Sequence, residues 1–284
     1  MEGSAARGAS TMNRFIHRMA LVLLVLCFSC AAHAYLLYVS DENPDAFLRW
    51  FEPRMSYVID SQESQEISFA VAEEQIVSSF AVWTQLNCGE SPTPFDFEYG
   101  GVVSGRSVGF DSENREDNEN LVIWVQSANE WLHPPAVLAL TSLTYDTKIG
   151  QIVDADVEIN DAGFVFSADA MSSEIDLRNT LVHEVGHVLG LDHSQEPGAT
   201  MFDKAPPGEI KKRDLESDDI EGFCALYGPN AFPMPPSAEN TGKSNSGCVL
   251  HAYSSRGLSG VYIVGLALLC LLITRGRRAT GPCR

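Results

Sequence analysis

Basic residues are scarce in this chain of 284 residues. Lys and Arg together number 19 against 38 Asp and Glu, which gives a formal net charge of -19 at pH 7. Proteins that bind nucleic acid contact its phosphates with Lys and Arg, so this balance argues against a DNA or RNA partner. An acidic surface can hold calcium, but the same composition also serves simple solubility, and charge alone does not choose between them.

Histidine and cysteine are also few, with seven of each. Only four of the histidines and two of the cysteines fall between residues 35 and 228, namely His133, His183, His187, His193, Cys88 and Cys224. Three of these histidines belong to one motif, described below. A second metal site rich in histidine therefore cannot be built.

The N-terminal residues 1–34 are typical of a secretory signal peptide. Arg14 and Arg18 give a positive region, Ala20–Phe28 is apolar, and Ala32-His33-Ala34 resembles a cleavage site. We therefore expect an exported mature chain that begins near Tyr35. A permanent N-terminal anchor is the alternative.

The C-terminal residues change character after Gly228. Residues 229–256 are rich in Pro, Ser and Asn and indicate a linker, because such a composition cannot bury a core. Gly257–Thr274 is an uncharged stretch of 18 residues, about the minimum for a bilayer core of ~30 Å. The tail, 275–284, opens with arginines, which favours a cytoplasmic C-terminus and a protein tethered to the outer face of the membrane.

The most informative stretch is the motif from His183 to His193. Residues four apart share one face of a helix, so His183 and His187 can present two imidazoles to one metal ion. Glu184 stands beside the first of them, where it can handle the proton of a water molecule. Gly190 can end the helix in a left-handed conformation and so deliver His193 as a third ligand. Three imidazoles and one open position are what a catalytic zinc needs.

This motif resembles the zinc-binding signature of the metzincin proteases. Ser194 directly after the third histidine is similar to the matrixin branch. Met201, eight residues after His193, matches the methionine turn that lies beneath the metal in that clan.

Periodicity predicts an α+β order around the motif. We expect strand structure within Ala46–Ile59, a helix over Ile67–Leu86 with one apolar stripe, and the metal-binding helix over Leu177–Leu189, capped by Asp176. A closing helix over Asp218–Tyr227 should have Ser217 as its N-cap and end at Gly228. Further strands are expected at Phe95–Tyr99, Leu121–Gln126, Val137–Tyr145 and Ile152–Ile159.

The resemblance implies more than these patterns do. It implies that residues 35–228 form a metzincin-like catalytic domain with a twisted mixed five-stranded sheet, a zinc-binding active-site helix and a C-terminal helix. His183, His187 and His193 would hold a catalytic Zn²⁺, Glu184 would be the catalytic base, and Ca²⁺ could be structural. The substrate would be a protein or peptide, lying along an edge strand near Leu138–Leu143, and the enzyme would be a monomer. Asp192 has no ligand role in that pattern and is expected to be a solvated turn residue.

Three features depart from the vertebrate-type pattern of that family. Little sequence separates Ala34 from the first strand, which leaves almost no room for a prodomain. Asp156 stands where a structural-zinc histidine would be expected. Cys88 superficially resembles an inhibitory cysteine, but we expect it to pair with Cys224, because an exported protein favours disulfides. Latency through a free Cys88 thiol is the competing hypothesis.

The C-terminal tail carries a second resemblance. Gly247-Cys248, a short spacer, an apolar stretch and terminal arginines are similar to myxobacterial-type sorting tails. In that reading the tail is processed and Cys248 becomes the attachment point. Either reading holds the domain at a cell surface.

Two non-enzymatic functions compete with the protease hypothesis. The first is a zinc-binding surface module without turnover, which has no use for Glu184. The second is a calcium-dependent adhesin, for which the alternating carboxylates Asp154, Asp156 and Glu158 would be the ligands. We expect those three side chains to form a solvated face of a half-buried strand instead.

Overall fold

The computed structural model describes residues 34–229 and residue 231, apart from residues 85, 116–117 and 170–172. The predicted apolar span and basic tail, the linker apart from residues 229 and 231, and all but the last residue of the signal peptide lie outside the described residues. Among the residues that are described, no helix is both long and apolar enough to cross a bilayer.

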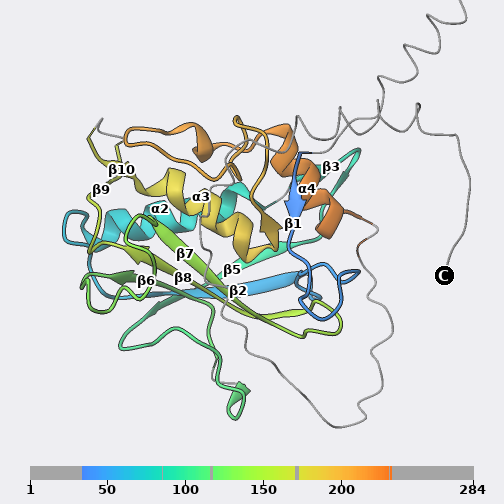
Figure 1. Cartoon of the computed structure of the whole chain (residues 1–284), viewed down its shortest axis with the longest axis horizontal. Coiled ribbons are helices and arrows are strands. Elements are labelled where there is room, and N and C mark those ends of the chain that lie inside the picture. The colour runs from blue at the N-terminus through green and yellow to red at the C-terminus, as the bar shows by residue number, and fades with distance from the viewer. Residues whose placement is uncertain (1–33, 85, 116–117, 170–172, 230, 232–284) are drawn as a thin grey trace, which may run out of the picture. The chain divides into compact units, whose positions relative to one another are not determined.

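A mixed five-stranded sheet with helices packed on one face forms the framework (Figure 1). Its strands are β2 (Arg54–Asp60), β5 (Asp96–Val103), β6 (Leu121–Val125), β7 (Ala139–Tyr145) and β8 (Ile152–Asn160). The order across the sheet is β5-β2-β6-β8-β7, and every neighbouring pair is parallel except β7 with β8. The antiparallel strand β7 therefore lies at one edge, where the resemblance placed the substrate-binding strand.

Helix α2 (Phe69–Val82) covers the sheet with the predicted apolar stripe. Ala72, Ile76 and Phe80 are buried, and the Phe80 ring stacks on Tyr57 of β2 with centroids 3.7 Å apart. Trp83 follows the helix, is fully buried, and donates from its indole N–H to the carbonyl of Val182 at 2.9 Å. This bond ties α2 to the metal-binding helix.

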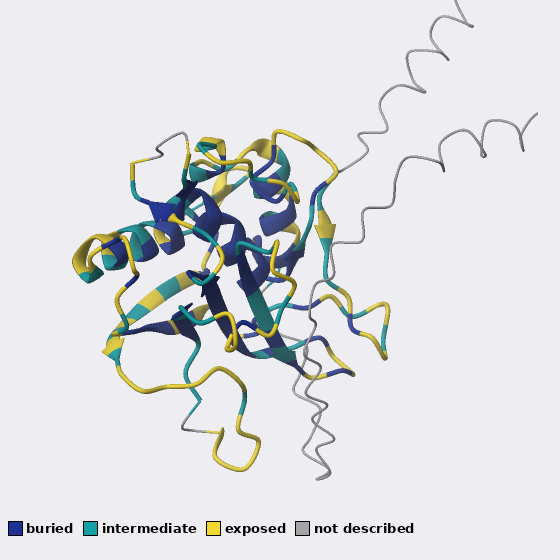
Figure 2. Ribbon diagram, turned by 60° about the vertical axis from the view of Figure 1, so that its left-hand side comes forward, coloured by how far each residue is buried: buried dark blue, intermediate teal, exposed yellow. Residues whose placement is uncertain are grey.

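Helix α3 (Leu177–Val188) is buried on all sides except at Arg178, because it lies between the sheet and the C-terminal segments (Figure 1). Figure 2 shows it as part of the buried centre of the molecule. The carboxylate of Asp176 accepts from the backbone N–H of Asn179 at 2.7 Å, so the predicted N-cap is confirmed. Two short strands precede α3, β9 (Phe166–Ser167) and β10 (Ile175–Asp176).

Helix α4 (Ser217–Tyr227) closes the described domain and begins one residue earlier than predicted. The N-cap is Glu216 rather than Ser217. The carboxylates of Glu216 and Asp219 each accept from the other's backbone N–H, which forms a reciprocal capping box. Two carboxylates thus satisfy two orphan N–H groups, and the Ser217 hydroxyl is not needed. The helix stops at Gly228, as expected.

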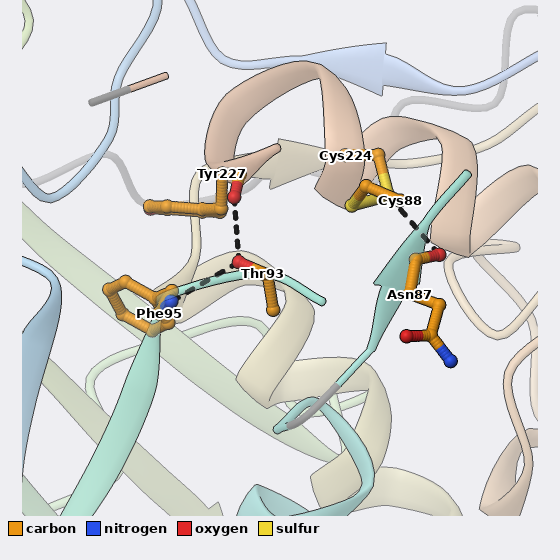
Figure 3. The surroundings of a disulfide bond; sticks show 6 residues. All are labelled: Asn87, Cys88, Thr93, Phe95, Cys224 and Tyr227. Atoms are coloured by element: carbon orange, nitrogen blue, oxygen red, sulfur yellow. Dashed lines mark hydrogen bonds between the residues drawn. A yellow bond between two sulfur atoms is a disulfide. The ribbon is translucent and has the colours of Figure 1, made fainter. Parts of the chain in front are cut away.

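A disulfide joins Cys88 to Cys224 and confirms the predicted pairing (Figure 3). It ties the hairpin of β3 (Asn87–Cys88) and β4 (Ser91–Pro92) to α4, with the two Cα atoms 5.5 Å apart. Beside it, the Thr93 hydroxyl donates to the carbonyl of Tyr227 at 2.6 Å, as Figure 3 shows. The paired state leaves no free Cys88 thiol for latency.

The expectation of a solvated carboxylate face on β8 is wrong. Asp154, Asp156 and Glu158 are all less than a tenth exposed. The carboxylate of Asp156 accepts from the backbone N–H groups of Gly109 and Leu121, at 2.6 and 3.0 Å, and the carboxylate of Glu158 lies 2.9 Å from Nε2 of His133. Loops cover this face, so these side chains offer no surface on which an adhesin could bind calcium.

Candidate metal centre and active site

The three motif histidines converge at the C-terminal half of α3. His183 and His187 lie one turn apart on the helix, and the chain then reverses at Gly190, whose φ is +92°. An added Cβ at Gly190 would collide with the carbonyl oxygen of Leu48, so glycine is needed for space as well as for conformation. After this turn, β11 (Leu191–Asp192) brings His193 back to the helix.

The distances within the triad match those of metal ligands. Nε2 of His193 lies 3.2 Å from Nε2 of His183 and 3.3 Å from Nε2 of His187. Zinc binds imidazole nitrogen at roughly 2.0–2.1 Å in a tetrahedron, and such a tetrahedron has edges of about 3.3 Å. Among the described residues, this is the only group of three or more His, Cys, Asp or Glu side chains that could share an ion.

Carbonyl acceptors fix the orientation of two of the rings. Nδ1 of His183 lies 2.7 Å from the carbonyl of Thr200, and Nδ1 of His187 lies 2.8 Å from the carbonyl of Leu191. A carbonyl can only accept, so Nδ1 carries the proton in both rings and the Nε2 lone pairs face the common point. Burial, assisted by the charge of Lys212, lowers the pKa of His183 well below its usual value. Neutral imidazole rings whose Nε2 lone pairs face one point are suited to binding zinc.

Glu184 is held beside the triad by the edge strand. Its carboxylate is 6% exposed and accepts from the hydroxyl of Thr141 on β7 at 2.7 Å. Burial raises the pKa of Glu184, and His187, the Thr141 hydroxyl and Lys212 oppose that shift. The carboxylate thus has one oxygen fixed by β7 and a raised proton affinity, which suits a group that accepts and returns a proton.

Met201, which the resemblance places beneath the metal, packs against α3 at Gly186, one residue before His187. It is 1% exposed, and an added Cβ at Gly186 would collide with its sulfur, so Gly186 of α3 allows the close approach. The turn at Thr200–Met201 is held by α4, because the carboxylate of Asp219 accepts from the backbone N–H groups of Thr200 and Met201, at 2.8 and 2.9 Å.

The carboxylate of Asp192 accepts from the backbone N–H of His193 at 2.7 Å. It is half-buried rather than solvated.

Four residues that touch or influence the site were not predicted, namely Tyr38, Thr141, Lys212 and Asp219. Lys212, from the 3-10 helix η2 (Lys211–Arg213), is 2% exposed, and its ammonium donates to the carbonyl of Phe202. Burial lowers its pKa to about 8. No short motif marks any of these four positions, since each comes from a different element and meets the triad only in the folded chain.

Comparison with known proteins gives the same picture. The family profile described as Matrixin matches residues 49–228. Metalloendoproteinase 1-MMP of Arabidopsis thaliana is 35% identical over 104 residues, which cover 36% of this chain and 28% of that protein. Interstitial collagenase B of Mus musculus is 27% identical over 216 residues, which cover 75% of this chain and 40% of that protein.

A further relative, neutrophil collagenase of Homo sapiens, is 39% identical over 72 residues, which cover 25% of this chain and 15% of that protein. The chain thus spans less than half the length of these relatives. The Matrixin profile nevertheless covers more than half of the chain and contains the triad, Glu184 and Met201. The chain belongs to the matrixin family of M10 peptidases.

Proposed function

We propose that this protein is a zinc-dependent endopeptidase that hydrolyses peptide bonds in proteins outside the cell or at its surface. The observation that carries the proposal is the meeting of three neutral imidazole nitrogens within metal-ligand distance, with the buried carboxylate of Glu184 beside them. His183, His187 and His193 would hold the ion through Nε2.

Bound zinc would supply Lewis acidity, which lowers the pKa of a water molecule and polarises a carbonyl. Glu184 takes the proton of the attacking water and returns it to the nitrogen of the leaving amine. Thr141 keeps one oxygen of Glu184 in place, so the carboxylate stays aligned with β7 during both transfers. A substrate added to the open edge of β7 as an extra strand would lie across these groups.

A zinc-binding module without turnover is the alternative function. The contact between Thr141 and Glu184 disfavours it, because a purely binding site gains nothing from a buried carboxylate aligned with the sheet edge. Replacing that carboxylate by an amide separates the two functions.

We expect Glu184→Gln to lower kcat/KM on a peptide library by roughly 10²–10⁴-fold, the usual contribution of a general base. Zinc content should stay at the wild-type level, because the imidazoles are intact. The matched control is Glu74→Gln, on the exposed face of α2, which should cleave like the wild type. Near-normal cleavage by Glu184→Gln would contradict the assignment of Glu184 as the general base. A wild-type protein that binds zinc without cleaving any peptide would favour the binding module.

The location of the enzyme is part of the proposal. The disulfide fits an oxidising compartment outside the cytoplasm, which agrees with the signal-like sequence at residues 1–34. The linker, the apolar stretch at Gly257–Thr274 and the basic tail support a domain tethered at the surface, either by a single span or by a processed tail.

The resemblance also implies structural calcium. Thermal unfolding with and without calcium chloride would measure whether calcium stabilises the domain.

A further inference from the structure

The segment at residues 34–48, here called the strap, lies before the stretch that matches the family profile. It nevertheless packs on the turn that carries the third histidine. Strand β1 (Leu36–Leu37) pairs antiparallel with β11, so that Leu36 faces Asp192 and Leu37 faces Leu191. The backbone N–H of Tyr38 donates to the carbonyl of Gly190 at 2.9 Å. The strap thus fixes the backbone between Gly190 and Asp192, which leads to His193.

Tyr38 extends this contact from the backbone to a ligand side chain. Its hydroxyl oxygen lies 3.2 Å from Nδ1 of His187, and the two rings lie with centroids 5.6 Å apart. The same Nδ1 lies 2.8 Å from the carbonyl of Leu191, which β1 holds in place. The N–H of His187 therefore faces two oxygen atoms, one on the strap and one on the strand that the strap pairs with.

The position of Tyr38 also relates the strap to the substrate edge. One hollow is lined by Tyr38, Val39 and Leu48 of the strap together with Thr141, Leu143 and Tyr145 of β7. Of these lining residues, Tyr38 contacts His187 and Thr141 contacts Glu184. The strap and the edge strand thus each contact one residue of the site.

We propose that Tyr38 is a positioning residue for His187, and that the strap is a working part of the metal centre rather than a leader to the domain. An acceptor for the distal N–H of a ligating histidine fixes the tautomer and the ring direction and makes Nε2 more basic. Loss of such a partner typically weakens metal binding by roughly 10–100-fold. The carbonyl of Leu191 remains in a Tyr38 variant, so we expect a loss near the lower end of that range, about 10-fold. The inference rests on the proposed zinc site.

The test compares the full chain carrying Tyr38→Phe with the wild type. Phenylalanine keeps the ring packing on His187 and removes only the hydroxyl. Zinc affinity is measured by competition with a chromophoric chelator, and the visible spectrum of the cobalt(II)-loaded protein reports ligand geometry directly. We expect zinc to bind about 10-fold more weakly, the cobalt band to change in position or intensity, and the melting temperature of the metal-free protein to stay unchanged.

The matched control is Tyr35→Phe, which removes a hydroxyl from the same strap at a residue that packs beside Gly222 of α4. It should leave zinc affinity and the cobalt spectrum as in the wild type. If Tyr38→Phe lowers the metal-free melting temperature but leaves the cobalt spectrum unchanged, its role is structural and the inference is overturned. Equal zinc affinity and equal spectra for Tyr38→Phe and the wild type overturn it as well. A wild-type protein that binds neither metal contradicts the proposed zinc site itself.

Discussion

At the scale of single residues, the most consequential unpredicted feature is the pair of buried acids on β8. Asp156 is stabilised by two backbone N–H groups, but burial still raises its pKa to about 6. Asp154, two residues earlier on the same face, has a pKa raised to about 7 by burial and by Asp156. Both are raised above their unfolded values near 3.9, so the folded state binds protons more tightly than the unfolded chain. The stabilisation is full below about pH 4 and is lost as the pH rises through 6 to 7.

We therefore expect Asp154→Asn to raise the free energy of unfolding at pH 8 by roughly 1–3 kcal/mol, since the amide carries no charge to desolvate. At pH 4 the variant should match the wild type closely. Urea unfolding of both proteins at pH 4, 6 and 8 measures the difference, with Asp45→Asn on the exposed surface as control. A difference that does not vary with pH would show that the Asp154 charge is not the cause.

The site residues were predictable from the sequence only where they are close together in it. His183, Glu184, His187 and His193 share eleven residues, and helical periodicity alone brings the first three together. Thr141 lies on a strand and Tyr38 on the strap, and each reaches the motif only through long-range pairing. Chain spacing carries no information about such contacts.

At the scale of elements, sequence patterns predicted the three described α-helices and the five strands of the main sheet, but not the loops that cover them. The alternation on β8 correctly separates two faces, yet it does not say whether a loop covers the second one. Here the residues around Gly109 do cover it. Two-residue strands such as β1 and β11 have no period at all, so the strap could not be recognised from its sequence.

The disulfide between β3 and α4 leads to a prediction at this scale. The disulfide spans a sequence separation of 136 residues, and loop-closure reasoning assigns a stabilisation of about 5 kcal/mol to a loop of that length. We expect Cys88→Ser combined with Cys224→Ser to lose several kcal/mol of unfolding free energy in urea. Reduction should destabilise the wild type but not this double variant. Cys248→Ser, which leaves the bridge intact, is the control, and a double variant as stable as the wild type would contradict the prediction.

At the scale of the whole molecule, the proposed tether would limit how far from the membrane the enzyme works. A flexible linker the length of residues 229–256 has a typical end-to-end distance of roughly 25–30 Å. The proposed substrates are thus proteins on the same surface or proteins that reach it.

Truncation before Cys248 should move the activity from the membrane fraction to the medium and leave kcat/KM on a soluble peptide unchanged. Fractionation of cells that express the full and the truncated chain, followed by peptide assays, measures both quantities. Full-length activity confined to the cytoplasm would rule out the topology. A truncated protein that stays with the membranes would show that another segment anchors it.

The dependence of the methionine turn on Asp219 also sets an order of events during synthesis. A ribosome delivers all three histidines before it delivers α4, the last described helix, with its 11 residues. Until Asp219 arrives, the backbone N–H groups of Thr200 and Met201 lack their acceptor, and the Thr200 carbonyl that orients His183 is not fixed. A chain that ends before α4 therefore contains all three histidines but lacks the carboxylate that fixes the turn beside them.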